Sequence, residues 1–334
     1  MLRETLEAQS ESSQPIETAS SISNQSFGTE HFLQIPSRFS PQPILRSIQF
    51  MNNKSPAFNE YSNIQSLALR NPLESFQNAQ RVRSQWKELN YLAEPDLEKA
   101  VREHECFRKM FSGIGIETVM MPGRETLSLD SIYVRDSLIP TPKGFVLASM
   151  GKDSRRPEPE VNAAFLKKRG FNIIGSIKEP GLMEGGDVVW LDDTNCTAGL
   201  GYRTNEEGIR QLRVLLGPQI TLHVCVLPHQ HGPQGVFHLM SILSPLDSDL
   251  VLAHSPLMSV PFRQVLLLSG IRIIEVPEEE YPLMGCNVLT YAPRQCLMLD
   301  GLPQTRKLLE DNGCSVRTYR GDEISCKGKG FYSF

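Results

Sequence analysis

The chain has 334 residues, which is enough for one large domain or two ordinary ones with a substantial buried core. Its net charge of −4 provides no basic surface for nucleic acid, and no apolar run approaches the roughly 20 residues that cross a bilayer. We therefore expect no nucleic-acid and no membrane partner. Seven scattered cysteines without a CxxC pair indicate reduced thiols, so we expect a cytoplasmic protein.

The N-terminal part of the chain has a composition of its own. Residues 1–56 are rich in Ser, Gln, Asn and Pro, and they lack both a sustained apolar period and the apolar core of a secretory signal. So little apolar surface cannot offset the entropy of ordering a chain. The sequence therefore predicts a disordered or loosely docked tail over residues 1–56 and a single domain of catalytic type over residues 57–334.

One pattern repeats from residue 57 onward, namely an amphipathic helix, a glycine at its end and a short apolar strand. A glycine just past a helix is typical of a left-handed stop, and a spacing of roughly 50 residues is typical of an array of one supersecondary unit. The glycines are Gly113, Gly170, Gly217, Gly270 and Gly313.

Pairs of strands precede four of these helices, which are expected over residues 161–168, over 205–216, before Gly270 and over 304–312. The first unit is less regular, with one strand (SLALRNP) and a long helix that ends at Phe111. A strand–strand–helix–strand unit cannot bury its own apolar face, so five units are expected to close around a common axis. The predicted fold is thus an α/β five-bladed propeller of ββαβ-type modules, with functional loops at its centre.

Two acidic clusters are candidates for the site. In LDSIYVRDSLIP, Asp130 and Asp136 are expected to flank a strand on one face. In LMEGGDVVWL, Glu184 precedes two glycines, Asp187 and an apolar strand, and paired glycines allow the backbone to approach closely. Either cluster alone is equally typical of a turn.

A histidine and several arginines complete the candidate residues. His238 is expected at the start of a strand, and imidazole is the side chain best suited to proton transfer near neutral pH. Arg203, Arg155 and Arg156 lie near predicted helix starts, where a guanidinium can fork onto a carboxylate of a ligand. Each of them also fits an ordinary core or surface role.

A metal site was the other interpretation of the histidines. His229 and His231 lie close together in PHQHG, but no third ligand follows at a suitable spacing, because His223 and Cys225 fall within a strand. The sequence therefore predicts no metal and no cofactor.

The clusters D-S-x-x-V-x-D, E-G-G-D-V, R-T-N-x-x-G and H-L, in this order on a five-fold repeat, resemble the dimethylarginine dimethylaminohydrolases and the related arginine deiminases and amidinotransferases. The resemblance covers residues 57–330. It implies a metal-free covalent mechanism on a small guanidino compound, such as a methylarginine or arginine, with citrulline as product.

The resemblance also implies roles for the candidate residues. Asp136 and Glu184 would accept hydrogen bonds from the guanidinium, with Asp130 and Asp187 supporting the same subsite. A cysteine thiolate would attack the guanidinium carbon, and His238 would protonate the departing amine and then activate water. The substrate α-carboxylate would be bound by the arginines, which are Arg203 with Arg155 or Arg156.

Two features depart from the family pattern. Deiminases and amidinotransferases have an Asp two residues after the histidine, where this chain has Met240, which favours an N-alkylated arginine. Arg135, before Asp136, is the form typical of the deiminases and therefore favours the deiminase subgroup instead. The family nucleophile follows a Gly-rich loop in the last module, but no cysteine follows Gly330 and the chain ends in FYSF.

The ending leaves three hypotheses. In the first, the chain is a dimethylargininase-type hydrolase in which Cys326, before the glycines, substitutes for the nucleophile. In the second, it is an inactive guanidine-binding or interaction protein with an incomplete last module. In the third, it is a metal hydrolase that uses His229 and His231. Cys286 flanks Asn287 and is not expected to be the nucleophile. A homodimer is left open.

Overall fold

The computed structural model describes residues 58–229 and 237–327, all within one compact unit that spans Lys54–Phe334. The tail predicted over residues 1–56 lies outside the described residues. None of the described helices is long and apolar enough to cross a membrane.

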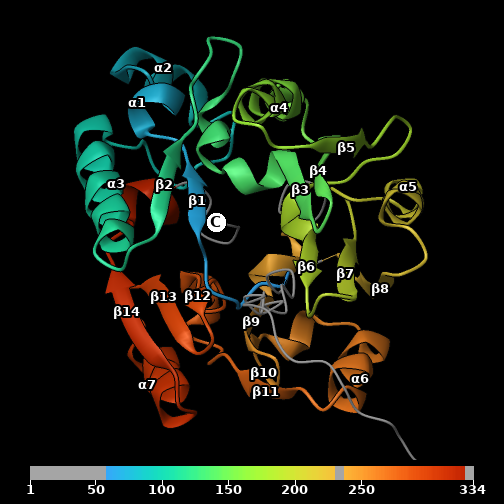
Figure 1. The fold of residues 1–334 in the computed structure, drawn as a ribbon. Coiled ribbons are helices and arrows are strands. Elements are labelled where there is room, and N and C mark those ends of the chain that lie inside the picture. Colours follow the sequence, from blue (N-terminus) through green and yellow to red (C-terminus); the bar gives the residue numbers. More distant parts are fainter. Residues whose placement is uncertain (1–57, 230–236, 328–334) are drawn as a thin grey trace, which may run out of the picture. The chain divides into compact units, whose positions relative to one another are not determined.

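The described strands form five separate sheets, so the fold is of the mixed α/β type (Figure 1). Four sheets have three strands, in which the first and second are antiparallel and the second and third are parallel. Their strands are β3 (Leu138–Thr141), β4 (Gly144–Leu147), β5 (Ile173–Ser176); β6 (Val188–Trp190), β7 (Asn195–Leu200), β8 (Thr221–Val226); β9 (Leu243–Asp247), β10 (Leu250–Ala253), β11 (Arg272–Glu275); and β12 (Leu289–Ala292), β13 (Gln295–Leu299), β14 (Ser315–Tyr319).

A helix joins the second strand of each of these sheets to the third, because parallel neighbours need a long crossover connection. This arrangement confirms the predicted order of strand, strand, helix, strand. The four helices are α4 (Glu158–Lys168), α5 (Glu206–Leu216), α6 (Val260–Leu268) and α7 (Pro303–Asp311). The closure of five modules into a propeller stays a prediction.

The first module differs from the others. It has two parallel strands, β1 (Ser66–Leu69) and β2 (Glu117–Met120), joined by α1 (Pro72–Ser75), α2 (Ala79–Gln85) and α3 (Leu97–Ser112). Buried Phe107 and Phe111 hold α3 against the hydrophobic core.

The predicted glycine stops hold for four of the five helices. Gly170, Gly217, Gly270 and Gly313 have φ values of 86°, 82°, 77° and 82°, a region that side chains with a Cβ rarely adopt. Gly113 is different, because its φ is −66°. The left-handed residue after α3 is Gly115, with a φ of 79°, so the turn closes two residues later than predicted.

Helix α5 illustrates how the sequence determines a module. Asn205 caps its first turn by accepting a hydrogen bond from the Gly208 amide (2.9 Å). Leu212 and Leu216 are buried against the strands, and Leu215 is partly buried beside them. The helix therefore packs with the face that its apolar spacing predicted.

Candidate active site

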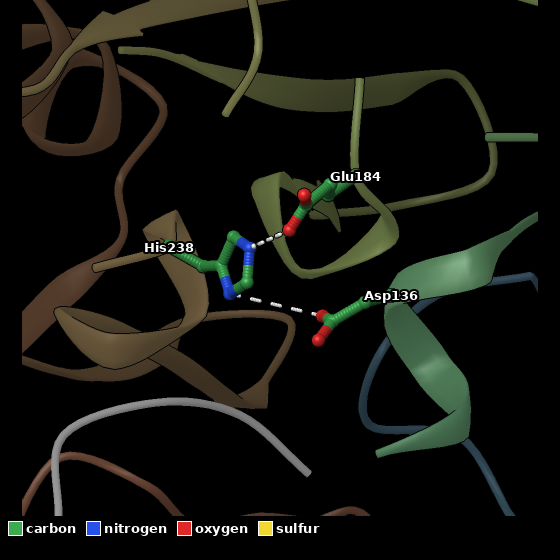
Figure 2. A group of neighbouring side chains, drawn as sticks. All are labelled: Asp136, Glu184 and His238. Carbon is green, nitrogen blue, oxygen red and sulfur yellow. Dashed lines mark hydrogen bonds and ion pairs between the residues drawn. The ribbon is translucent and has the colours of Figure 1, made fainter. Parts of the chain in front are cut away.

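Three polar side chains meet just before the first strands of three successive sheets. Asp136 precedes β3, Glu184 precedes β6 and His238 precedes β9. In Figure 2 their side chains converge from three different segments of the chain, with the imidazole between the two carboxylates.

Distances and burial define this group. His238 Nε2 is 2.7 Å from Glu184 Oε2, and His238 Nδ1 is 3.7 Å from Asp136 Oδ1. The side chains are 6%, 0% and 2% exposed for His238, Glu184 and Asp136. Charged groups this deeply buried need partners.

The backbone reaches these positions differently from the prediction. The sequence predicted a strand between Asp130 and Asp136. The structure instead has two tight turns there, Leu129–Ile132 and Val134–Ser137. Likewise His238 caps a turn, Leu239–Ser241, and the strand begins only at Leu243. Tertiary contacts of the buried carboxylates override the local β preference of these apolar residues.

Two glycines make room for the convergence. A Cβ on Gly186 would lie 2.6 Å from Asp136 Oδ1 and 2.9 Å from His238 Cγ, and one on Gly185 would lie 2.2 Å from the Arg135 carbonyl oxygen. A side chain at Gly186 would push the acid and the imidazole apart, and one at Gly185 would collide with the backbone just before β3. The GG pair of the EGGD motif is therefore a packing requirement of the site.

Glu184 is the most heavily bonded member of the group. Besides His238, its carboxylate accepts hydrogen bonds from the Gly151 amide (2.9 Å) and from Arg203 Nη1, which is 3.1 Å from both oxygens. Arg203 is 16% exposed, so it joins the buried group to the surface. Arg203 thus contacts Glu184, and its binding of a substrate carboxylate stays a prediction.

Arg155 does not have the free guanidinium that the sequence analysis assigned to it. Its Nε and Nη2 bond Glu158 at 2.7 and 2.8 Å, Nη2 also donates to the Tyr133 carbonyl at 2.8 Å, and Nη1 pairs with Asp136. The side chain is 4% exposed. Asp136 and Glu158 occupy its fork in this structure, and binding of a ligand carboxylate by Arg155 stays a prediction.

Arg156 lies on the surface instead. Its side chain is 56% exposed and pairs with Asp153 at 2.9 Å and with Glu179 at 3.3 Å. The expectation that it binds substrate is therefore not supported. Two adjacent arginines thus have opposite environments, since Arg155, the last residue of the turn Asp153–Arg155, is buried and Arg156 faces solvent.

Asp187 holds the histidine turn in place. Its Oδ1 accepts the Leu239 amide (2.9 Å) and its Oδ2 accepts the Thr204 hydroxyl (2.7 Å). Burial raises the pKa of Asp187 to about 6, and His238 and these hydrogen bonds act in the other direction. In this structure Asp187 holds the turn that carries His238, and its contact with substrate stays a prediction.

Asp130 is buried beside the group and pairs with Lys152. Lys152 also donates to the Leu89 carbonyl (3.4 Å). The sequence analysis missed Lys152, Glu158 and Thr204. Lys152 and Thr204 lie in the loops that follow the second strands of their sheets, which is the one sequence signal that could have identified them.

Cys326 and Cys286 are poor nucleophiles in their environments. Cys326 ends a turn, Asp322–Cys326, and burial raises the pKa of its thiol. Cys286 lies before β12 rather than at the start of the strand, and burial likewise raises the pKa of its thiol. The thiolate, not the thiol, attacks carbon. Because a raised pKa favours the thiol, neither cysteine is activated as a nucleophile.

The two other histidines proposed for a metal do not form a site in the described residues. His229 hydrogen bonds to Tyr202, and His231 lies outside the described residues. Within the described ranges, Asp136, Glu184 and His238 offer ligand atoms within 4.8 Å of one another. A metal there would have to displace Arg155 and Arg203 and deprotonate the imidazole, so the group is a poor fit for a cation.

The charge state of His238 gives a prediction. Burial lowers the pKa of His238, but Asp136, Asp187 and Glu184 outweigh burial and raise the pKa to about 9. The folded pKa lies above the ordinary value of 6.5, so this pairing stabilises the fold fully below about pH 6.5, and the stabilisation is lost as the pH rises through about 9. We expect the His238 ring resonances, assigned with a His238→Asn variant, to titrate near pH 9. A midpoint near 6.5 would contradict the paired imidazolium.

Comparisons with known proteins give the family. The arginine deiminase family model matches residues 128–263, which contain all three members of the group. A dimethylarginine dimethylaminohydrolase of Streptomyces coelicolor is 30% identical over 205 residues, which cover 59% of this chain and 73% of that protein. One from Pseudomonas aeruginosa is 27% identical over 234 residues, covering 68% and 84%.

Solved structures agree on the fold. The Pseudomonas aeruginosa enzyme, as a cysteine-to-serine mutant complexed with citrulline, aligns with a TM-score of 0.64 at 24% identity, covering 80% of this chain and 96% of that one. The N-terminal domain of ArgZ, a cyanobacterial arginine dihydrolase, aligns with a TM-score of 0.67 at 17% identity, covering 79% and 94%. At these identities the structures show the fold alone.

The fold and the family match define a class of guanidine-modifying proteins. The chain belongs to the superfamily of dimethylarginine dimethylaminohydrolases, arginine deiminases and amidinotransferases, as the motifs predicted. Its named curated relatives are of the dimethylarginine dimethylaminohydrolase type.

Proposed function

We propose that this chain acts on guanidino compounds as a dimethylargininase-like hydrolase, converting an N-methylated arginine to citrulline and methylamine or dimethylamine. The observation that carries the proposal is the buried group of Asp136, Glu184 and His238. The relatives named dimethylarginine dimethylaminohydrolase support the same chemistry.

The carboxylates suit a guanidinium ligand. Each already pairs with a guanidinium of the protein, Asp136 with Arg155 and Glu184 with Arg203. Carboxylates bind the planar fork of a guanidinium with directed hydrogen bonds. Because Arg203 is the more exposed of the two arginines, a substrate guanidinium would take its place on Glu184 and leave it to bind the substrate α-carboxylate.

His238 is suited to transfer the protons. A cysteine thiolate forms a bond to the guanidinium carbon, the bond from that carbon to the methylated nitrogen breaks, and His238 gives the leaving amine a proton. Water then attacks the same carbon and gives its proton to His238, and the carbon–sulfur bond breaks to release citrulline and the thiolate. With a pKa of about 9, His238 carries the proton for the first step at neutral pH.

Met240 supports an alkylated substrate over arginine. It stands two residues after His238 and is partly buried in the hydrophobic core. A thioether cannot accept the strong hydrogen bonds that an unsubstituted guanidinium donates, whereas it packs well against methyl groups. Arg135, whose guanidinium pairs with Glu60 at 2.8 Å, is bound within the protein.

A second candidate function is guanidine binding without turnover. The observation in its favour is Cys326, whose thiol is partly buried and has a raised pKa. The group of Asp136, Glu184 and His238 does not depend on that thiol. A chain without an activated cysteine would therefore keep the binding site and lose the covalent step.

The wider setting belongs to the same proposal. We place the five sheets as the blades of one five-bladed α/β-propeller around the site, in a cytoplasmic protein that acts without metal or cofactor and as a monomer or homodimer. The order of strands and helices in the four complete modules supports this architecture.

The test is citrulline release by the full chain from asymmetric dimethylarginine and from arginine, with binding of both measured by calorimetry. We expect dimethylarginine to bind more tightly than arginine, and any turnover to disappear in a His238→Ala variant. Binding without citrulline selects the second candidate. A folded protein that neither binds nor converts either compound would contradict both candidates.

A further inference from the structure

Two buried cysteines lie on neighbouring strands of the last sheet. Cys296 is the second residue of β13, and Cys314 immediately precedes β14. The two strands are parallel and lie side by side (Figure 1), with Cys296 paired with Val316. Val316 follows Cys314 by two residues, and alternate residues along an extended chain share a face. The register therefore brings both thiols to the same face of this sheet.

The two thiols contact each other. They form a side-chain hydrogen bond, and both belong to one hydrophobic cluster, in which Cys296 is 0% and Cys314 is 6% exposed. The backbone is fixed on both sides. Thr290 of β12 pairs with Cys296, and the Cys314 amide donates to the carbonyl of Leu309 in α7 (3.0 Å). Two sulfurs that fixed backbones hold in contact are well placed to form a bond.

The surroundings favour the thiolate form of Cys314. The Cys296 thiol donates a hydrogen bond to Cys314, and this is the main reason that the pKa of Cys314 is lowered. The guanidinium groups of Arg294 and Arg272 act in the same direction, against burial and the carboxylate of Asp247. The same hydrogen bond, together with burial, raises the pKa of Cys296. One member of the pair is thus a nucleophile, while the other keeps its proton.

Other buried thiols of the chain have different surroundings. Burial raises the pKa of Cys196 to about 12, and it also raises the pKa of Cys225, whose sulfur accepts a hydrogen bond from the Ser259 hydroxyl (3.7 Å). Thiols of this kind stay protonated and inert. The combination of a thiol neighbour and nearby guanidinium groups therefore sets Cys314 apart from these residues.

We propose that Cys296 and Cys314 form a modification site, at which a peroxide converts the two thiols to a disulfide. The Cys314 thiolate attacks one oxygen of hydrogen peroxide, the O–O bond breaks, and the leaving hydroxide takes up a proton to become water. The Cys296 sulfur then bonds to the Cys314 sulfur while the S–O bond of the sulfenic acid breaks. The Cys296 proton leaves with that oxygen as a second water. Peroxide is reduced and the thiols are oxidised, so no other reactant is needed.

The disulfide closes one crossover of the fold. Residues 297–313 lie between the two cysteines and contain the rest of β13, all of α7 and the turn at Gly313. A link across such a segment restricts the unfolded chain and joins β13 directly to the start of β14. Its formation needs no displacement of a charged group, because Arg294 remains bonded to Asp247 (2.7 Å) and to the Asn312 carbonyl (2.9 Å).

Peptide mapping of the full chain after treatment with hydrogen peroxide tests the proposal. The remaining thiols are alkylated in denaturant, and trypsin then separates the two cysteines into the peptides 295–306 and 308–317. We expect these peptides to be joined, lighter than their sum by two hydrogen atoms and released by dithiothreitol. Cys106 is exposed and serves as the internal control for contact with peroxide. Oxidised Cys106 together with two separate, alkylated peptides would overturn the proposal.

Single variants distinguish the roles of the two thiols. In Cys296→Ser, which keeps a hydroxyl that can donate to Cys314, the sulfenic acid has no partner thiol, so dimedone should label Cys314. In Cys314→Ser, the buried Cys296 should stay reduced. The control Cys196→Ser removes a buried thiol outside the pair and should still form the link. Dimedone labelling of Cys296 in Cys314→Ser, or an unlabelled Cys314 in Cys296→Ser, would contradict the assigned roles.

Discussion

Replacing Arg155 with Gln is expected to lower the free energy of unfolding by about 3–5 kcal/mol. Arg155 is the shared partner of Asp136 and Glu158, and both carboxylates are buried. Glu158 has a raised pKa because burial outweighs its pairing with Arg155. Without the guanidinium, Asp136 and Glu158 lose the cation that they share, so one of these buried carboxylates must take up a proton or the turn must open. Urea denaturation at neutral pH measures the loss.

Arg156→Gln is the matched control, because the two arginines are neighbours and differ in burial. Its pairs with Asp153 and Glu179 are solvent-exposed, so the free energy of unfolding should change by less than about 1 kcal/mol. Acidification should rescue Arg155→Gln in part, since protonation of a carboxylate removes the negative charge that Arg155 balanced. If Arg155→Gln were as stable as Arg156→Gln but bound dimethylarginine more weakly, Arg155 would be a ligand contact after all.

The modules of the fold could be predicted because each one is encoded locally. Apolar spacing and a terminal glycine located α5 and α7 to within a residue at each end, since caps and periodicity act over a few neighbours. Helix α4 begins three residues before the predicted start, at Glu158. Pro159 lies in its first turn, where a helix tolerates proline, so the helix extends beyond the residues that the sequence pattern indicated.

The members of the site could be predicted, but their partners could not. Asp136, Glu184 and His238 occupy equivalent places in successive modules, so motif and repeat together indicated them. Nothing in the sequence distinguishes Arg155 from Arg156, because burial depends on how the turn after β4 packs against the turns that precede β3. The same limit explains why Lys152 was missed.

Replacing Glu184 with Gln is expected to have the largest effect on the site. Glu184 is fully buried and neutralises both Arg203 and His238. Burial raises its pKa, but these two partners outweigh burial and hold the pKa of Glu184 well below 4.5, so the carboxylate is charged throughout the neutral range. The amide leaves two buried cations facing each other without the charge between them. We expect a loss of about 3–5 kcal/mol in the free energy of unfolding and a fall of the His238 pKa below 9.

The two readouts distinguish a charge effect from simple loss of packing, because Gln has nearly the shape of Glu. A purely steric role for Glu184 predicts an unchanged His238 titration, whereas a charge role predicts that the imidazole releases its proton at lower pH. Glu207→Gln is the control, since that carboxylate pairs with Arg210 on the surface of α5 and should alter neither stability nor the titration. Guanidine binding should fail in Glu184→Gln and persist in Glu207→Gln, and binding that survives in both would place the guanidinium away from Glu184.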